Sequence, residues 1–93
     1  MRDEITLVRA FGVTGSEARV LLALFDGEVL DRYRLLDAIG SSKSGRRNID
    51  VHVCHIRRKF GKNSIRTIHS YGYEMDKELR KTLAMVLPVA MAA

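Results

Sequence analysis

A basic stretch in the middle of the 93-residue chain carries side chains whose types and spacing suggest chemistry. Residues 46–60 read RRNIDVHVCHIRRKF, and at about 100° per residue one helical face would collect Arg47, Val51, Cys54 and Arg58. His55 falls beside them. Arginine donors suit guanine, valine suits the thymine methyl group, and histidine or cysteine can make variable base contacts. The pattern by itself leaves two interpretations open: a helix in the DNA major groove, and a basic, solvated helix without a partner.

The charge distribution also favours a polyanionic partner. The net charge is +5, but the segment from Lys43 to His69 has eight Lys or Arg and one acid, Asp50, which makes it +7. The remainder has eight bases and ten acids, which makes it −2. A basic patch on a slightly acidic body is typical of a nucleic-acid binder. A membrane surface is not favoured, because the face opposite the basic one lacks large apolar anchors and has the pattern of an ordinary core.

Catalytic and metal-binding readings have little support. Cys54 and His55 are the one nucleophile–base pair that the sequence suggests, but neighbouring helical residues diverge by about 100° and are poorly placed for proton transfer. His52 and His55 could share an ion, yet the usual zinc spacings and a second cysteine are missing. We expect no enzyme activity, no cofactor and no metal. His52 is interpreted as a packed, hydrogen-bonded histidine.

The single cysteine excludes an intrachain disulfide and fits a reducing cytosol. The start of the chain lacks the pattern of a signal peptide, and the apolar run Leu83–Ala93 is too short to span a bilayer. We therefore expect a cytoplasmic protein, located at the bacterial nucleoid.

Apolar periodicity predicts the elements that position the basic helix. Residues 2–11 predict a short helix that groups Ile5, Val8 and Phe11, with Leu7 adjoining, and a strand over 5–8 is the alternative. Thr14 and Glu17 match a capping box, which predicts a second helix that Gly27 ends. Residues 29–30 form an extended link or a minimal strand. Asp31 is expected to cap a third helix that runs to Gly40.

The polar loop 41–45 leads into the basic helix, whose core side would be Ile49, Val53, Ile56 and Phe60. After the turn that follows Gly61, residues 65–68 and 71–75 alternate enough to predict two strands joined at His69-Ser70. Gly72 is expected to take a backbone angle that side chains disfavour. Residues 76–87 predict an amphipathic helix that places Leu79, Leu83 and Val86 on one side.

The predicted order of elements indicates the fold class: helices, a short loop, a further helix and then a β-hairpin. We predict a mainly α protein with a small β-hairpin wing, of the winged helix-turn-helix (α+β) class. The DNA-binding domain would cover residues 1–75, and residues 76–93 would form a tail with a short amphipathic helix.

Four segments in this order resemble the OmpR/PhoB-type DNA-binding domain of bacterial response regulators. They are VTGSEARVLLAL, VLDRYRLLDAI, RNIDVHVxxIRRKF and IRTIxxYGY, and together they span about Val13 to Met75. The last two are the most diagnostic. The resemblance implies that the helix holding Asp50 to His52 enters the major groove and that the hairpin at His69-Ser70 is a wing at the minor groove. Asp50 would then pair with Arg46 or with a group of the wing.

The resemblance also assigns roles to individual residues. It implies base contacts from Val51, Cys54 and His55, and phosphate contacts from Arg47, Arg57, Arg58 and Thr67. The full set of expected DNA-binding residues adds two cations of the basic patch and two side chains of the wing: Arg46, Lys62, His69 and Tyr71.

Three departures from the family pattern matter. We expect no receiver domain, and therefore a stand-alone regulator similar to small winged-helix regulators of phages and alphaproteobacteria. Residues 1–13 have no room for the family's four-stranded N-terminal sheet. The positions of Cys54, His55 and His69 are often Arg in the family, so the target sequence cannot be transferred.

The predicted function is sequence-specific binding of double-stranded DNA in transcription regulation, with a recognition helix at about 46–60 and a wing at about 65–75. Two copies, as a homodimer or in tandem, would supply enough contacts, and RNA polymerase is a further expected partner. The alternatives are a protein-interaction winged helix that binds polymerase or another regulator, and a nonspecific nucleoid-type DNA binder.

Overall fold

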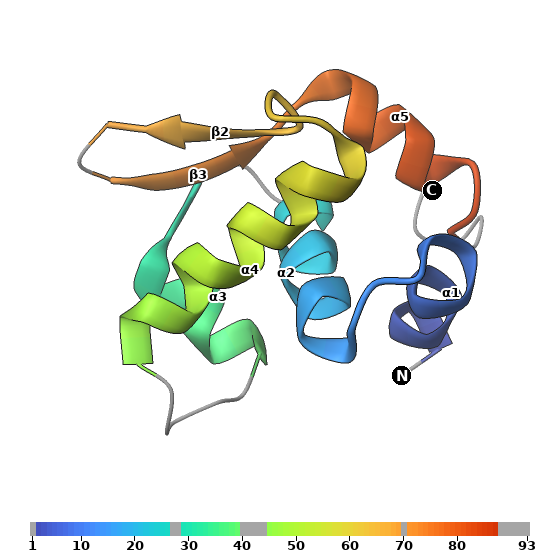
Figure 1. The fold of residues 1–93 in the computed structure, drawn as a ribbon, viewed down its shortest axis with the longest axis horizontal. Coiled ribbons are helices and arrows are strands. Elements are labelled where there is room, and N and C mark those ends of the chain that lie inside the picture. Colours follow the sequence, from blue (N-terminus) through green and yellow to red (C-terminus); the bar gives the residue numbers. More distant parts are fainter. Residues whose placement is uncertain (1, 27–28, 40–44, 70, 88–93) are drawn as a thin grey trace.

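The computed structural model describes residues 2–26, 29–39, 45–69 and 71–87 (Figure 1). The predicted fold class, mainly helical with a small antiparallel sheet, is confirmed, and so is the order of the main elements. These are α1 (Arg2–Phe11), α2 (Gly15–Asp26), β1 (Leu30–Asp31), α3 (Arg32–Ile39), α4 (Gly45–Phe60), β2 (Ile65–Ile68), β3 (Gly72–Met75) and α5 (Lys77–Ala84).

Helix α1 forms as predicted. Leu7, which was predicted to adjoin the group of Ile5, Val8 and Phe11, is completely buried, whereas Ile5 is 50% exposed. The orientation follows from the pair Leu7 and Phe11, which are four residues apart and share one helical face. Phe11 packs edge-on against Phe60 of α4, with ring centroids 5.1 Å apart.

The capping box at the start of α2 is present and reciprocal. The Glu17 backbone N–H donates to Thr14 Oγ1 over 3.1 Å, and the Thr14 N–H donates to Glu17 Oε1 over 3.0 Å. Each bond satisfies a donor that a helix start leaves without an intrahelical partner. The helix then buries an apolar series that forms the centre of the core: Ala18, Val20, Leu21 and Leu24. The predicted stop at Gly27 lies outside the described residues.

Helices α3 and α4 pack against α2 and against each other. Asp31 caps α3 as predicted, because its Oδ1 accepts the Arg34 N–H over 2.9 Å. On α4 the predicted core positions Ile49, Val53 and Ile56 are at most 1% exposed, and Phe60 lies at the core edge. The helix begins at Gly45, one residue earlier than predicted. The predicted end of α3 at Gly40 and loop residues 41–44 lie outside the description.

The wing is a three-stranded sheet with strand order β1-β3-β2, in which both pairings are antiparallel. Ile65 pairs with Met75, Ile68 pairs with Gly72, and Leu30 pairs with Tyr73. The predicted hairpin is therefore present. The extended link before α3 is its third strand, and it joins the hairpin to the helix-turn-helix.

Gly72 is required for a reason other than the predicted one. Its φ angle is not positive, so the expectation of a disfavoured backbone angle was wrong. A Cβ at this position would instead lie 2.0 Å from the Leu30 carbonyl oxygen and 2.7 Å from the Asp31 Cα. The backbones of β1 and β3 approach so closely here that no side chain fits.

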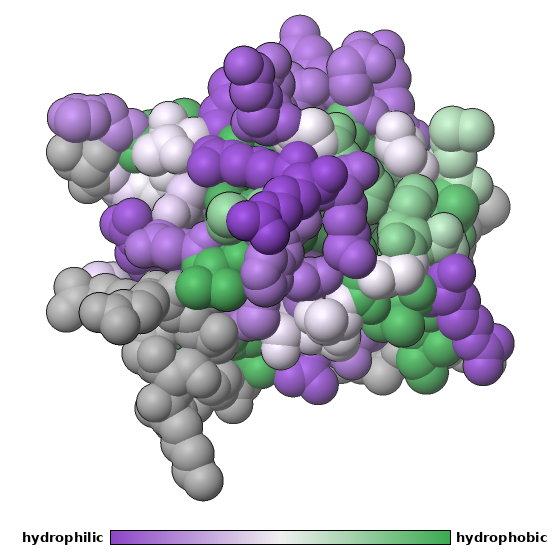
Figure 2. Space-filling view, viewed as in Figure 1, coloured by the Kyte–Doolittle hydropathy of each residue, from purple (hydrophilic) through white to green (hydrophobic). Residues whose placement is uncertain are grey.

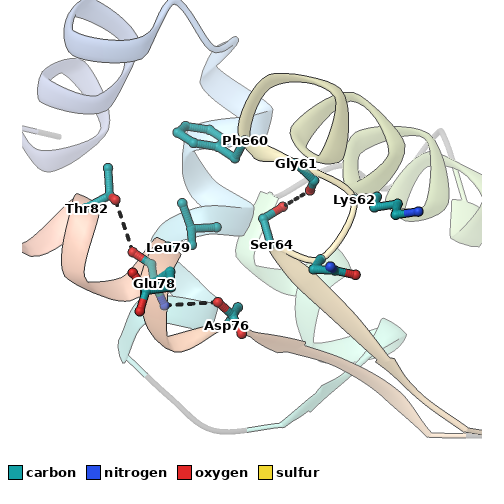
Figure 3. A pocket seen from close by; sticks show the side chains of 9 residues that line it. Phe60, Gly61, Lys62, Ser64, Asp76, Glu78, Leu79 and Thr82 are labelled. Carbon is teal, nitrogen blue, oxygen red and sulfur yellow. Dashed lines mark hydrogen bonds between the residues drawn. The ribbon is translucent and has the colours of Figure 1, made fainter.

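The junction of α4, β2 and α5 is held by local hydrogen bonds (Figure 3). Gly61 ends α4 with a φ of 114°, and its carbonyl accepts the Ser64 hydroxyl over 2.7 Å. Asp76 caps α5 by accepting the Glu78 N–H over 3.0 Å. A hollow of about 530 Å³ lies between this turn and α5, with Phe60 and Leu79 in its lining.

Helix α5 and the turn after it pack leucines into the same core as the other helices. Leu79, Leu83 and Leu87 are at most 7% exposed, whereas Val86 is 37% exposed, so the prediction for Val86 was wrong. The chain turns after Ala84, and the Leu87 N–H donates to the Leu83 carbonyl over 3.0 Å, which brings Leu87 to the buried side. Arg80 donates to the carbonyls of Leu24 and Phe25 at the end of α2.

The close approach at Gly72 gives a prediction. Gly72→Ala should lower the free energy of unfolding by about 2–4 kcal/mol, because the added carbon must push β1 away from β3. Urea denaturation measures this change. Gly15→Ala is the matched control, since its Cβ would meet only Glu4 Oε1 at an ordinary 3.5 Å and it lies in the first turn of α2. Equal stability of both variants would contradict the explanation.

Candidate nucleic-acid interface

The face of α4 opposite its core residues is open to solvent. Val51 is 43% exposed, and Cys54, His55 and Arg58 are exposed with it. In the front view, hydrophilic side chains gather over the middle of the molecule, where α4 runs (Figures 1 and 2). The structure thus brings four of the predicted major-groove residues onto one accessible surface. The side chains of Arg46 and Arg47 lie outside the described part of the chain.

Arg57 connects α4 to the wing. Its Nε and Nη2 donate to the Ile65 carbonyl over 2.9 and 2.6 Å, and Nη2 also donates to Thr67 Oγ1 over 3.0 Å. The guanidinium thus fixes β2 beside the recognition helix. Because Thr67 Oγ1 accepts this bond, its own hydroxyl hydrogen remains available to an acceptor such as a phosphate oxygen.

The other cations of the basic segment divide into two groups. Arg66 pairs with Glu74 over 2.9 Å and with Asp76 over 3.1 Å, and the Lys59 ammonium donates to the Gly12 carbonyl over 2.9 Å. These two serve the fold. Arg58 and Lys62 are exposed, and neither pairs with a carboxylate among the described residues. Their charges are accessible to solvent.

The wing also presents accessible side chains. His69 is exposed at the end of β2, and Tyr71 is 51% exposed just before β3. The Tyr71 N–H donates to the Ile68 carbonyl over 2.9 Å, which closes the turn. Ser70, the other residue of the predicted wing tip, lies outside the described residues.

A buried carboxylate stands behind the recognition helix. His55 Nδ1 lies 3.3 Å from Oε2 of Glu17, whose side chain is only 3% exposed. Glu17 therefore serves the capping box with one oxygen and the recognition helix with the other. Sequence reasoning identified the cap but not this second contact, because only the packing of α2 against α4 brings the two residues together.

His52 is packed, but the predicted hydrogen bond is absent. Both ring nitrogens are buried and have no hydrogen-bond partner among the described residues. Burial lowers the pKa of His52 below its ordinary value of 6.5, the nearby Glu17 carboxylate opposes this effect, and His55 adds to it. Without a partner, an imidazole in this position is more stable neutral than charged.

Asp50, Tyr73 and Arg32 form a cluster at the base of the wing. The Tyr73 hydroxyl donates to Asp50 Oδ1 over 2.5 Å, and Arg32 Nε donates to the same oxygen over 3.1 Å. The Arg32 guanidinium lies 5.5 Å from the centre of the Tyr73 ring, and that of Arg57 lies 6.0 Å from it. The expectation that Asp50 pairs with a group of the wing is met by Tyr73.

The cluster shifts the pKa of each member. Burial alone would raise the pKa of Asp50, but the hydrogen bonds from Tyr73 and Arg32 hold it below its ordinary value. Burial and the bond to Asp50 raise the pKa of Tyr73. The bond to Asp50, followed by the charges of Tyr73 and Asp50, raises the pKa of Arg32. At neutral pH the cluster thus holds an ionised carboxylate between two donors.

Arg32 was not among the predicted functional residues. It is the first residue of α3, where the helix dipole disfavours a cation. This position is the one signal that the sequence offers for Arg32, and it is a weak one, because the dipole effect on an exposed cation is small. Its partner Asp50 lies 18 residues further along the chain.

These features define a winged helix whose helix α4 has one exposed face, and the comparisons with known proteins give the same class of protein. Residues 9–75 match the family described as "Transcriptional regulatory protein, C terminal". The chain belongs to this family of OmpR/PhoB-type DNA-binding domains, and it is a DNA-binding domain of transcription regulation.

A curated relative supports the same assignment. The chain is 37% identical over 71 residues to the Transcriptional regulatory protein CseB of Streptomyces coelicolor. The match covers 72% of this chain and 30% of the relative, so the chain spans less than a third of that protein's length. No solved structure matches the chain significantly.

The described part of the chain holds neither a candidate metal site nor a candidate membrane-spanning helix. No group of three or more His, Cys, Asp and Glu side chains is arranged to hold a metal ion. None of its helices combines the length and the apolar character needed to cross a bilayer.

The cluster at Tyr73 predicts a loss of stability when its hydroxyl is removed. Tyr73→Phe should lower the free energy of unfolding by about 1–2 kcal/mol, because the buried Tyr73 ring loses the hydroxyl that donates to the charged, half-exposed carboxylate of Asp50. Urea denaturation measures the change. Tyr71→Phe, which alters an exposed tyrosine, should leave stability unchanged. A Tyr73→Phe variant as stable as the parent protein would refute this role.

His52 predicts a dependence of stability on pH. Its pKa is lowered in the folded protein, so as the pH falls through 6.5 the unfolded chain takes up a proton that the folded chain does not. The free energy of unfolding should therefore decrease below pH 6.5, until the lowered pKa of the folded state is passed. His52→Leu should flatten this dependence between pH 5 and 7, whereas His69→Gln in the wing should retain it. Denaturation at a series of pH values tests both, and identical slopes in all three proteins would exclude His52 as the cause.

Proposed function

We propose that this chain binds specific double-stranded DNA sequences, with α4 in the major groove and the β2–β3 hairpin against the adjacent minor groove. The observation that carries the proposal is the division of α4 into two faces. Ile49, Val53 and Ile56 fix one face in the core, and the other presents Val51, Cys54, His55 and Arg58. The 16-residue helix is about 24 Å long, enough to lie along several base pairs.

Phosphate contacts would set the position of the domain on DNA. Arg58 and Lys62 carry charge into solvent, and Arg46 and Arg47 belong to the first turn of the same helix. Thr67 can donate its hydroxyl hydrogen while it accepts from Arg57. In this proposal Arg57 itself acts chiefly by holding the wing in register with α4, and its charge attracts the backbone from behind Thr67.

Base contacts would come from the centre of the exposed face. Val51 presents a branched apolar group that fits a thymine methyl. Cys54 and His55 follow within one turn. At the wing, His69 and Tyr71 would reach the sugar-phosphate edge of the minor groove. No part of this arrangement requires a cofactor or a catalytic step, and we assign the chain no enzymatic role.

One domain of this size contacts few base pairs, so we propose that two copies act on one site, either in tandem or as a dimer. Contact with RNA polymerase or another regulator is a second candidate function. Apolar side chains gather on the right of Figure 2, where α1 and the end of α5 lie, and Ile5 and Met85 are 50% and 84% exposed. Such a contact would be apolar and would respond little to salt.

Selection of bound sequences from a random DNA pool, followed by binding measurements at several salt concentrations, tests the proposal. We expect a recovered motif and an affinity that falls steeply between 50 and 200 mM salt. Arg58→Ala should weaken binding to the motif and to random DNA alike and reduce the salt slope by about one unit. Val51→Ala should instead reduce discrimination among bases and leave the slope unchanged.

Lys81→Ala is the matched control, because Lys81 is a highly exposed cation on α5 whose ammonium lies 4.0 Å from Glu78. It should bind DNA as the parent protein does. Equal affinity for the motif and for random DNA would favour the nonspecific nucleoid-type alternative. Absence of salt-dependent DNA binding would favour the protein-interaction alternative.

A further inference from the structure

The contact between Glu17 and His55 connects the capping box of α2 with the exposed face of α4, on which His55 lies. Glu17 lies in the first turn of α2, and its side chain is 3% exposed. Its Oε1 accepts the Thr14 N–H over 3.0 Å, and its backbone N–H donates to Thr14 Oγ1 over 3.1 Å. These two bonds hold the carboxylate in one position and direct Oε2 to His55 Nδ1 at 3.3 Å.

A neutral imidazole has one nitrogen that donates and one that accepts, and the partner of one nitrogen decides the role of the other. A carboxylate oxygen can only accept. The Glu17–His55 contact at 3.3 Å is an ion-pair contact, not a hydrogen bond, but a carboxylate charge beside Nδ1 favours a hydrogen over a lone pair on that nitrogen. It therefore stabilises the tautomer in which His55 carries its hydrogen on Nδ1. In that tautomer Nε2 is an acceptor. His55 is 47% exposed, so the far side of the ring is accessible from the DNA-facing surface.

We infer that Glu17 is a positioning residue for base recognition, because it makes His55 Nε2 a hydrogen-bond acceptor. This inference rests on the proposed major-groove role of α4. In the major groove, the donors that an acceptor can read are the N4 amino group of cytosine and the N6 amino group of adenine. His55 in this form discriminates against base positions that present only acceptors, such as O6 and N7 of guanine.

Glu17 does not act on the neighbouring side chains His52 and Cys54 in the way that it acts on the hydrogen position of His55. His52 lies one turn earlier on α4 and senses the charge of Glu17, but its buried ring nitrogens have no hydrogen-bond partner among the described residues. Cys54 is exposed, and its side chain leaves α4 in a direction about 100° away from that of His55. Of the described contacts of His55, the one to Glu17 is the one that distinguishes the two ring nitrogens.

The substitution Glu17→Gln reverses the polarity of this contact with little change in shape. Glutamine serves the capping box as well as glutamate does, so its oxygen can keep the bond from Thr14. Its amide nitrogen then faces His55 Nδ1 as a donor, and the hydrogen of the imidazole moves to Nε2. His55 Nε2 becomes a donor, which suits guanine O6 or N7, adenine N7 or thymine O4.

Two measurements on the full chain test the inference. Nitrogen-15 NMR at pH 8 should show the His55 hydrogen on Nδ1 in the parent protein and on Nε2 in Glu17→Gln. Site selection from a random DNA pool should then show one altered position in the motif. The preference there should change by about threefold to tenfold, from a base with an amino donor to one with an acceptor. Glu4→Gln, which alters the carboxylate paired with Arg19, should change neither result.

The outcomes separate this inference from the function on which it rests. A His55 hydrogen on Nε2 in the parent protein overturns the inference without any variant, which covers the case in which Glu17→Gln fails to fold. A tautomer change that leaves the selected motif identical also overturns it, while specific, salt-dependent binding of both proteins would leave the proposed function intact. Failure of the parent protein to select any motif would instead contradict the proposed function.

Discussion

The placement of the wing relative to the recognition helix depends on the environment of Tyr73. This ring is almost completely buried between α3, α4 and the sheet, and its hydroxyl reaches Asp50 on α4. Two guanidinium groups, of Arg32 and Arg57, lie within 6.0 Å of the ring centre. An isolated surface ion pair contributes about 0–1 kcal/mol. Here the apolar ring, the short hydrogen bond and the cations act on one residue, so that β3 cannot move without breaking several contacts.

This arrangement changes how the basic segment is understood. The sequence between Lys43 and His69 carries a charge of +7, yet part of that charge is internal to the fold. Arg66 is matched by Glu74 and Asp76, and Arg57 donates to the backbone of β2. These groups determine the geometry of the surface, whereas Arg58 and Lys62 supply charge to it. Counting cations alone therefore overestimates the contacts available to a phosphate backbone.

Features set by neighbours in the sequence could be predicted, and features set by neighbours in space could not. The 3.6-residue period of Ile49, Val53 and Ile56 fixed the buried face of α4, and the spacing of Thr14 and Glu17 fixed the start of α2. The exposure of Val51, Cys54 and Arg58 followed from the same period. In contrast, the need for Gly72 arises from the Leu30 carbonyl, more than forty residues earlier in the chain. The partner of Arg32, and the lack of a hydrogen-bond partner for His52 among the described residues, depend on tertiary packing in the same way.

The helices at the two ends show how tertiary packing revises a periodic pattern. Val86 follows Leu79 and Leu83 in the expected heptad-like spacing, but α5 ends at Ala84 and the turn that follows buries Leu87 in its place. Both α5 and most of α1 lie outside residues 9–75, which match the family. Each is nevertheless part of the common core, through Leu7 of α1 and through Leu79 and Leu83 of α5, which Leu87 joins from the turn after α5. Complete burial of a leucine side chain stabilises the folded state by about 1.5–3 kcal/mol relative to leaving it exposed. The two end helices therefore enlarge the core that holds α2 in place. Helix α2 in turn packs against the buried apolar side of α4, and it carries Glu17, whose carboxylate contacts His55.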